Sequence, residues 1–452
     1  MKLKGFILII LSMVLTAAYL LPSSDNIAGV LALVLIGAAF IFSVVFKQHV
    51  IANLGMVVGM HWLELEGYFI TLYILFPAIL TLLFFQMRNT VWYRDKPWLL
   101  SIAIMEIYVL LILVVRPYDL RYTMFYLYGI TFLFFMSVSL NKWDGRLLHI
   151  FLSIHLYFMY LWSFVEHFVS DEIRIGGPSL SATNFAALIA TSWTIWHINA
   201  WLSKKAGVLL LGANFVLTFI CIVFTGSRMG FIGVAVGMVF SIFCYFMKNA
   251  MAERRGRIGS FAVKLCVSTA VILAVGLLIW KVLPDTLYIK QGLLVLASGK
   301  MDNSSLGRIG VWLTALDIIQ HKPIWGCGPR NFLEYNKAFL ETYSAIPMVA
   351  FIPRLGHAHN VYLMLLSEQG IVGFGAVSAV SALCFRELLI HIKNHWDGFG
   401  LSLLGGALVF FTLGLIDVFP LFPSTFGWGA WYMGVLFSLR FIRRKEQCES
   451  QS

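Results

Sequence analysis

Charge is scarce in this 452-residue chain: only 12% of its residues are Asp, Glu, Lys or Arg, and 60% are hydrophobic. A soluble domain carries about 25% charged residues, so the composition excludes an ordinary soluble enzyme and favours a protein whose solvent is lipid. Acidic residues are the scarcer charge, which leaves a formal net charge of +11. We interpret the excess of Lys and Arg as basic cytoplasmic loops of a membrane protein, and we expect no nucleic-acid partner.

Cysteine is also rare. The six cysteines are scattered, mostly within apolar runs, and form neither a Cys-x-x-Cys metal pattern nor the paired framework of a disulfide-rich domain. They therefore predict no cysteine-based metal centre and indicate no particular redox compartment.

Long apolar runs, by contrast, are abundant. Runs of about 20 apolar residues cross a bilayer as helices, and runs such as 207–225 lack the period-two alternation of barrel strands. We therefore predict an all-α polytopic membrane protein with about 12–14 transmembrane helices. The candidate spans are 5–21, 27–46, 50–60, 68–85, 99–115, 122–140, 147–165, 180–202, 207–225, 231–246, 261–280, 370–390, 399–416 and 427–439.

The distribution of Lys and Arg predicts the orientation of these spans. The first run follows Met1-Lys-Leu-Lys and is interpreted as a retained helix, because many spans follow it. If this end is cytoplasmic and every span crosses, most Lys and Arg residues fall on the cytoplasmic side, as the positive-inside rule expects. Both termini are then cytoplasmic.

One external connection is far longer than the others and divides the chain into spans 1–281, a periplasmic loop 282–360, and spans with a short basic tail, 361–452. A loop of this length is expected to be structured and functional. Residues 304–320 predict an amphipathic helix, followed by a turn at Pro323, Gly326 and Gly328. The predicted apolar face of this helix holds Ile309, Trp312, Leu313, Leu316 and Ile319.

Two arginines lie at positions that suit either ligand binding or a purely structural role. Arg228 lies at the boundary between two spans, where an arginine is often only a membrane-surface anchor. Its neighbours Gly226 and Gly230 are small enough to let a ligand approach the backbone. Arg308 lies in the first turn of the predicted helix, a position that disfavours a cation and attracts an anion. Both positions suit contact with a negatively charged ligand.

A pair of histidines closes the long loop. His357 and His359 precede a helix expected over 361–367, with Asn360 as its N-cap. A helix N-terminus disfavours a protonated imidazole, so a histidine here can stay neutral and act as a general base. His-x-His is also half of a metal site, but no further cluster of donors stands nearby on the outer face, so we expect no metal. Two hydrogen-bonded interface histidines are the plain alternative.

The outer face is rich in arginine, against the positive-inside tendency, which indicates an anionic ligand. A lipid-linked diphosphate is one such ligand at a membrane. These arginines are Arg116, Arg121, Arg174, Arg228, Arg308, Arg330 and Arg354.

Three blocks of sequence carry a family resemblance. They are Thr225-Gly-Ser-Arg-Met-Gly230, Ser305-Leu-Gly-Arg-Ile-Gly-Val-Trp312 continuing to the turn at 323–329, and His357-Ala-His-Asn-Val-Tyr-Leu363. In the last block, His359-Asn360 is followed by nine residues and then by Gly370-Ile-Val-Gly373. The blocks resemble the O-antigen ligase and polymerase superfamily of bacterial envelope glycosyltransferases, over roughly residues 209–375.

This resemblance implies an all-helical, GT-C-like enzyme of the bacterial inner membrane. Such enzymes take a glycan from undecaprenyl diphosphate on the periplasmic side and pass it to a hydroxyl of lipid A-core, of another repeat unit or of a protein serine. The two essential arginines of the family correspond to Arg228 and Arg308, and its histidine to His359. The arginines take up the charge of the leaving diphosphate, so we expect neither metal nor cofactor.

Further residues are expected to contact the substrates. His357 and Asn360 are neighbours within the histidine motif, Arg330 and Arg354 belong to the basic outer face, and Asp417 is a candidate for the acidic residue noted near the last spans of ligases.

The ligase is the function we expect, with the polymerase as its close alternative because the sequence does not display the acceptor. The end of the chain soon after residue 439 is taken against a protein oligosaccharyltransferase, which often carries a further soluble part. A flippase of lipid-linked oligosaccharide is the alternative from another class. It predicts pseudo-symmetric halves and charges in mid-membrane, whereas polar groups here gather at one face.

Overall fold

The structure is a computed structural model, and it describes residues 100, 103–104, 107–108, 111, 143–169, 174–177, 181–252, 303–328, 331–344, 354–419, 428–429 and 431–440. No strand occurs within these ranges, and the helices confirm the all-α membrane protein. The predicted spans before residue 99, and those at 122–140 and 261–280, lie outside the described residues.

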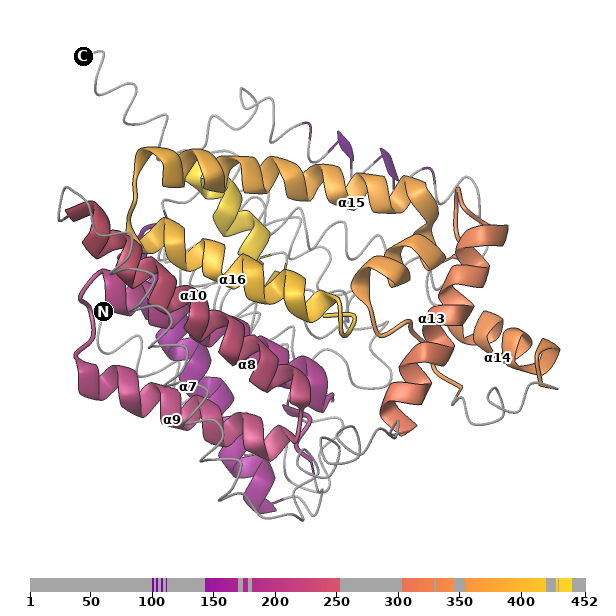
Figure 1. Cartoon of the computed structure of the whole chain (residues 1–452), viewed down its shortest axis with the longest axis horizontal. Helices are drawn as coiled ribbons and strands as arrows, with labels where there is room; N and C mark the ends of the chain where they lie inside the picture. The colour runs from indigo at the N-terminus through magenta and orange to yellow at the C-terminus, as the bar shows by residue number, and fades with distance from the viewer. Residues whose placement is uncertain are drawn as a thin grey trace, which may run out of the picture.

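The described helices follow the apolar runs of the sequence (Figure 1). Four are long and apolar enough to cross a membrane: α7, α9, residues Arg228–Lys248 of α10, and α15; α16 is apolar but shorter. The helices are α7 (Gly145–Val169), α8 (Ala182–Leu202), α9 (Val208–Thr225), α10 (Arg228–Ala252), α13 (Asn303–His321), α14 (Phe332–Thr342), α15 (Val361–Asn394) and α16 (Gly398–Gly414).

Helix α8 forms the centre of the bundle and is buried along almost its whole length, in contact with α7, α9, α10 and α16. Glycines on α10 allow close contact with α8. A Cβ added at Gly230 would lie 2.9 Å from Ala186, and one at Gly233 would lie 2.9 Å from Ala190. Small residues bring membrane helices into van der Waals contact in this way. Gly230 therefore serves helix packing, and our interpretation of it as an opening for a ligand was wrong.

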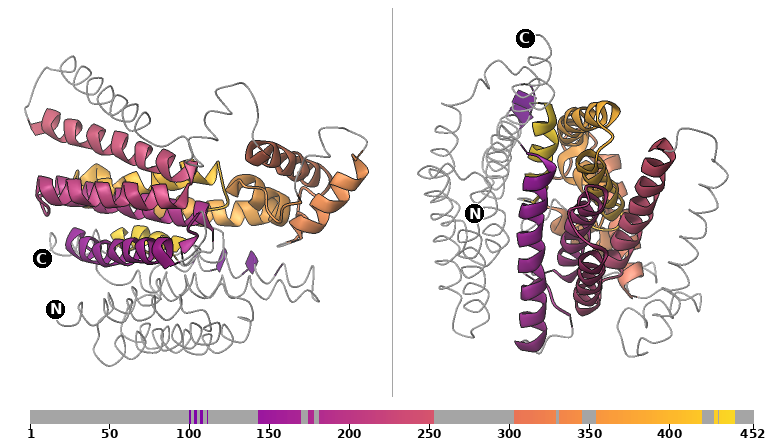
Figure 2. Two further views of the ribbon diagram at one scale, coloured as in Figure 1. Left: turned by 90° about the horizontal axis from the view of Figure 1, so that it is seen from below. Right: turned by 90° about the vertical axis from the view of Figure 1, so that its left-hand side faces the viewer.

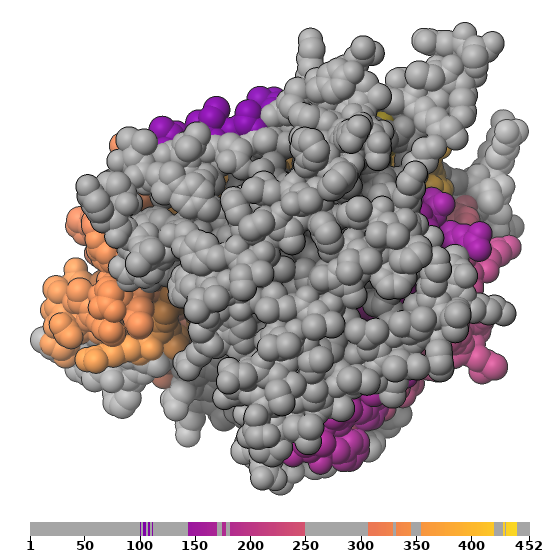
Figure 3. Space-filling model, turned by 180° about the vertical axis from the view of Figure 1, so that it is seen from behind, coloured from indigo at the N-terminus to yellow at the C-terminus, as the bar shows by residue number. Residues whose placement is uncertain are grey.

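The long loop folds into a small helical unit at one end of the bundle. Figure 2 shows α13 and α14 beyond the end of the bundle, and Figure 3 shows the orange surface of this region apart from the magenta surface of α7 and α9. The sequence pattern predicted α13 closely but did not predict α14. Their contact includes a hydrogen bond of 2.9 Å from Asn336 Nδ2 to Thr314 Oγ1.

The apolar face predicted for α13 was wrong. Its buried side chains are Ile318 and the smaller Val311, Thr314 and Ala315. Leu313 and Leu316, by contrast, are 40% and 52% exposed. Periodicity gives weight to the largest apolar residues, whereas close contact of α13 with α14 and α15 requires small ones.

Helix α15 bends at Gly370, where φ is 64° and ψ is −170°. The short helix predicted over 361–367 and the span predicted over 370–390 are therefore the two arms of one bent helix. Figure 1 shows the short arm turning back toward the C-terminal end of α16. Contact between Gly414 and Val361 joins these two ends.

Candidate active site around His359

The start of α15 is tied to the end of α16. Asn360 is the N-cap, as predicted: its Oδ1 accepts hydrogen bonds from the N–H groups of Tyr362 (2.9 Å) and Leu363 (3.0 Å). Its Nδ2 donates to the carbonyl of Leu415 at 3.0 Å, just past α16. The hydroxyl of Tyr362 donates to the carbonyl of Phe411 at 3.3 Å. These bonds place the residue before the cap, His359, beside the residues that follow α16.

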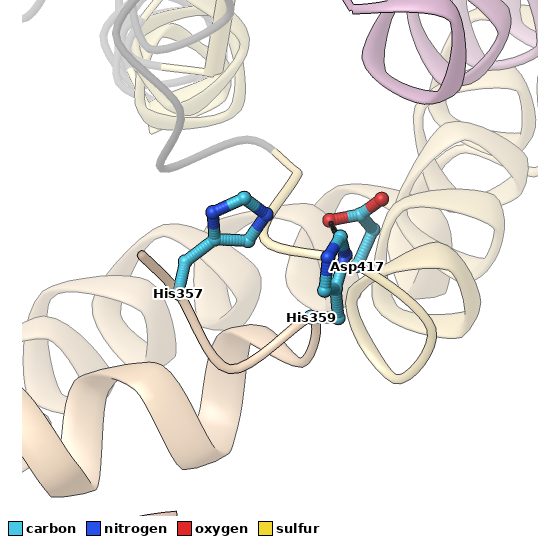
Figure 4. Close-up of side chains that lie close together, drawn as sticks. All are labelled: His357, His359 and Asp417. Carbon is cyan, nitrogen blue, oxygen red and sulfur yellow. Dashed lines mark hydrogen bonds and ion pairs between the residues drawn. The ribbon is translucent and has the colours of Figure 1, made fainter. Parts of the chain in front are cut away.

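His359 and Asp417 form a hydrogen-bonded pair (Figure 4). His359 Nδ1 lies 3.1 Å from Asp417 Oδ1, although 58 residues separate the two. Because an ionised carboxylate only accepts hydrogen bonds, this contact assigns the proton to Nδ1 and the lone pair to Nε2. His359 also has a φ of 45°, in a region that costs a non-glycine residue of order 1–3 kcal/mol and is found most often at functional sites.

The Asp417 side chain is only 2% exposed. Burial by itself would raise the pKa of this carboxyl. The hydrogen bond to His359, the positive charges that His359 and His357 carry once they are protonated in acid, and the backbone N–H of Val418 hold the pKa at about 2. The group is therefore ionised at neutral pH. The buried negative charge of Asp417, hydrogen-bonded to Nδ1 of His359, favours the imidazolium that forms when Nε2 takes up a proton.

His357 lies beside His359 (Figure 4). Its ring centroid is 4.2 Å from that of His359. Burial lowers the pKa of His357 to about 4, the charge of His359 adds to this, and Asp417 partly opposes it. His357 is therefore neutral at neutral pH and retains a lone pair. One ligand atom from each of His357, His359 and Asp417 lies within 4.8 Å of the others. The third metal donor that we did not find in the sequence is therefore Asp417, which follows α16.

The predicted turn at 323–328 docks into the bend of α15. Because the bend at Gly370 interrupts the helical hydrogen bonds, backbone groups on both sides of it are open to this turn. The four backbone hydrogen bonds run from Cys327 N to Ser367 O (2.8 Å), Gly328 N to Glu368 O (2.8 Å), Ile371 N to Pro323 O (2.8 Å) and Val372 N to Ile324 O (3.4 Å). They fasten α13 to the helix that begins beside His359.

The glycines of the histidine signature have structural roles in this contact. Gly370 adopts a positive φ, and a Cβ there would overlap the carbonyl oxygen of Ile324. A Cβ on Gly373 would lie 2.5 Å from the hydroxyl of Tyr108, which donates a hydrogen bond of 2.9 Å to Gln369 Oε1. The number of residues between His359 and these glycines therefore sets the length of the short arm of α15.

The two predicted arginine ligands lie near the N-terminal ends of two helices. Arg228 is the first residue of α10 and is half-buried. Arg308 is also half-buried, but α13 begins at Asn303, so this arginine lies in the second turn and not in the first. The convergence of both guanidinium groups on His359 stays a prediction.

Arg174, one of the arginines predicted on the outer face, lies beside the Arg228 motif. Its Nε donates a hydrogen bond of 2.9 Å to the carbonyl of Thr225. The side chain packs over Gly226, which ends α9 with a φ of 59°. Glu166 holds the following residues by accepting from the N–H groups of Gly176 and Gly177 at 2.8 and 2.9 Å. The only signal in the sequence was the excess of arginine on the outer face.

The remaining candidates are less informative. Arg330 lies outside the described residues. Arg354 is 63% exposed, with its guanidinium 3.9 Å from the equally exposed Glu341, and such surface pairs contribute about 1 kcal/mol or less. A substrate-binding role for either residue stays a prediction.

Residues 213–378 match the family model for O-antigen ligase. Over this segment the chain is similar to O-antigen ligases. This match confirms the resemblance read from the three sequence blocks, since it begins within α9, includes Arg228, Arg308 and His359, and ends beyond Gly373. Asp417 lies outside the matched O-antigen ligase segment. No curated protein matches the chain.

The match to O-antigen ligases and the long apolar helices both indicate a membrane-bound enzyme class. O-antigen ligases and polymerases are glycosyltransferase-like enzymes whose substrates are a lipid-linked glycan and an acceptor. The four long apolar helices make the chain a multi-pass membrane protein.

Proposed function

We propose that the protein is an O-antigen ligase that transfers a glycan from undecaprenyl diphosphate to a sugar hydroxyl of lipid A-core. We place the site on the periplasmic face of the bacterial inner membrane, with both termini in the cytoplasm. The observation that carries this proposal is the buried, ionised Asp417 on Nδ1 of His359, within a chain that has a segment similar to O-antigen ligases. This pair provides a general base for a sugar hydroxyl, which is a weak nucleophile.

In the proposed step, the acceptor oxygen attacks the anomeric carbon as its bond to the diphosphate breaks. The hydroxyl proton passes to Nε2 of His359, and the electron pair of the broken bond leaves with the diphosphate. Asp417 stabilises the imidazolium that results. General-base catalysis of this kind contributes typically 10²–10⁴-fold to the rate. A single displacement inverts the anomeric configuration.

Arg228 and Arg308 are proposed to bind the diphosphate. A guanidinium donates two parallel hydrogen bonds to phosphate oxygens, and the N-terminus of α10 adds partial positive charge beside Arg228. Charge stabilisation by two arginines makes a metal ion or other cofactor unnecessary in this scheme. His357, Asn360, Arg330 and Arg354 are proposed as further substrate contacts.

A deletion in the source organism tests the choice of acceptor. If the protein is a ligase, electrophoresis of lipopolysaccharide is expected to show core without polymer, while lipid-linked polymer accumulates. If core carries a single repeat unit, the protein is the polymerase. A flippase is separated from both by incubating purified protein with lipid-linked glycan and acceptor, because only a transferase forms a covalent product.

The arginines provide a sharper test of the mechanism. We expect Arg228→Ala and Arg308→Ala each to lower kcat by about 10²–10³-fold, as the loss of one charge-stabilising donor does in other enzymes. Arg228→Lys and Arg308→Lys are expected to recover only part of the rate, since an ammonium cannot donate the paired hydrogen bonds. Transfer is measured with purified protein and lipid-linked glycan.

Lys337→Ala is the matched control for the arginine variants. Lys337 is a basic residue of the same loop unit, and its ammonium forms an exposed pair with Glu334 at 3.1 Å. Its removal is expected to leave transfer unchanged. If lysine restored full activity at both arginine positions, charge alone would suffice and paired binding of the diphosphate would be wrong.

A further inference from the structure

The cluster around His359 has the composition of a transition-metal site. His357, His359 and Asp417 each offer a ligand atom, and these atoms lie within 4.8 Å of one another. Figure 4 shows the two rings and the carboxylate gathered in one place, from the loop before α15 and the residues after α16. Two imidazoles and one carboxylate are typical ligands of Zn²⁺, and three protein ligands leave a fourth position open.

The surrounding structure holds these three residues in place. Ala358, between the histidines, is fully buried in the small core formed with α13, which includes Val311 and Ala315. Asn360 ties the following residue to the end of α16. A tetrahedral ion with bonds of about 2.0–2.1 Å needs ligand atoms about 3.3 Å apart. Side-chain rotations that move these atoms by about 1 Å bring them to that spacing on a backbone that is already fixed.

Asp417 provides the second, independent sign of a ligand. Its Oδ1 accepts from His359 and from the N–H of Val418 at 2.8 Å. Its Oδ2 is buried, and no hydrogen-bond donor reaches it from the described part of the chain. Buried carboxylate oxygens are normally paired, because an unpaired one loses its hydration without compensation. A cation bound by the three residues would satisfy this oxygen.

We infer that His357, His359 and Asp417 bind one divalent transition-metal ion of the zinc class, and that the bound ion inhibits glycan transfer. The ion takes the place of the proton on Nδ1 of His359, beside Asp417. The remaining ring proton is then on Nε2, which can no longer accept the acceptor proton, and the ion also neutralises the charge of Asp417. The inhibition rests on the proposed function, whereas the binding does not. Zinc would act as a reversible inhibitor of the ligase.

The binding test uses the full-length protein in lipid nanodiscs, with any histidine tag removed and metal stripped with EDTA before dialysis. Zn²⁺ is titrated in competition with a chromophoric chelator. We expect one high-affinity ion per chain. Affinity is expected to fall by at least about 10–100-fold in His357→Ala and in Asp417→Ala, since even the loss of a residue that only supports a ligand costs this much.

Two further variants distinguish loss of a metal ligand from loss of the fold and from removal of an unrelated surface histidine. His357→Gln keeps the size and a polar end group, so a loss of zinc affinity at an unchanged melting temperature reports on the ligand and not on the fold. His321→Ala removes an exposed ring that lies 3.4 Å from Asp317 on α13 and should leave the zinc affinity unchanged. Equal zinc binding by wild type and the His357→Ala/Asp417→Ala double variant would show adventitious binding only and overturn the inference.

The inhibition is tested separately, by adding one equivalent of Zn²⁺ to the transfer assay and then removing it with EDTA. We expect transfer to fall to below a tenth of its rate and to recover after chelation. Zinc that binds without slowing transfer, or that accelerates it, would overturn the inhibitory role. A preparation that transfers no glycan under any condition contradicts the proposed function, and the zinc affinities of the variants still decide the metal site.

Discussion

His359→Ala is expected to transfer glycan about 10²–10⁴-fold more slowly than the wild-type protein. The variant loses the imidazole of the His359–Asp417 pair, which is the proposed acceptor of the hydroxyl proton. Binding of the lipid-linked glycan should change little, because the proposed diphosphate contacts are the arginines. The rate is measured in single-turnover reactions with purified protein, at saturating donor and acceptor.

His321→Ala is the control for this prediction. His321 is exposed, ends α13 and contacts Asp317 of the same helix, so it has the same ring beside a carboxylate without the buried setting. Its removal is expected to leave the rate within a factor of about two, since surface substitutions change little. Full activity of His359→Ala would remove the base assignment.

Asp417→Asn separates positioning from catalysis within the same prediction. The amide keeps the size of the side chain but removes the buried charge that favours the imidazolium, so we expect transfer to slow by about 10²-fold or more. A purely structural aspartate would lower the yield of folded protein and leave the rate of the folded fraction unchanged.

Gly370→Ala is expected to destabilise the protein by about 3 kcal/mol or more. The backbone at Gly370 has φ 64° and ψ −170°, a conformation that is essentially restricted to glycine. The added Cβ would also overlap the carbonyl oxygen of Ile324 in the docked turn. Loss of this contact frees the short arm of α15 and with it His359, so transfer should fall with stability. Thermal unfolding in detergent and the transfer assay measure the two effects.

Gly375→Ala is the matched control, five residues further along the same helix, where no atom lies within 4 Å of an added Cβ. Alanine there should be neutral or slightly stabilising, because it has the higher helix propensity. Gly326→Ala tests the other side of the contact: φ is 65°, and a Cβ would lie 2.5 Å from the carbonyl oxygen of Glu368. If Gly370→Ala melted and transferred glycan like the wild type, the docked turn would not be what holds His359 in place.

Much of the chain's organisation could be predicted because it depends on local chemistry. The apolar runs predicted α9 and α16 to within two residues, since a helix in lipid must satisfy its own backbone. The cap at Asn360 was predicted because its side chain bonds N–H groups two and three residues later. The family was also recognisable, because its motifs are short blocks of neighbouring residues.

Errors arose where contacts between helices decide the outcome. The buried face of α13 was assigned to large residues such as Leu316, but helix contact selects Ala315 and its small neighbours. Gly230 was interpreted as an opening for a ligand, but Ala186 occupies the space beside it. In both cases the partner that determines the role of the residue is distant in sequence.

The sequence by itself determined that the chain is a helical membrane protein with a segment that resembles O-antigen ligases, with His359 before a helix cap and with arginines near span ends. Only the tertiary structure decided that Asp417 belongs to the same site. The bend at Gly370 turns the start of α15 back onto the end of α16, and this brings together two residues that are 58 positions apart. No local pattern encodes that contact, because it depends on where two helices end and not on the residues between them.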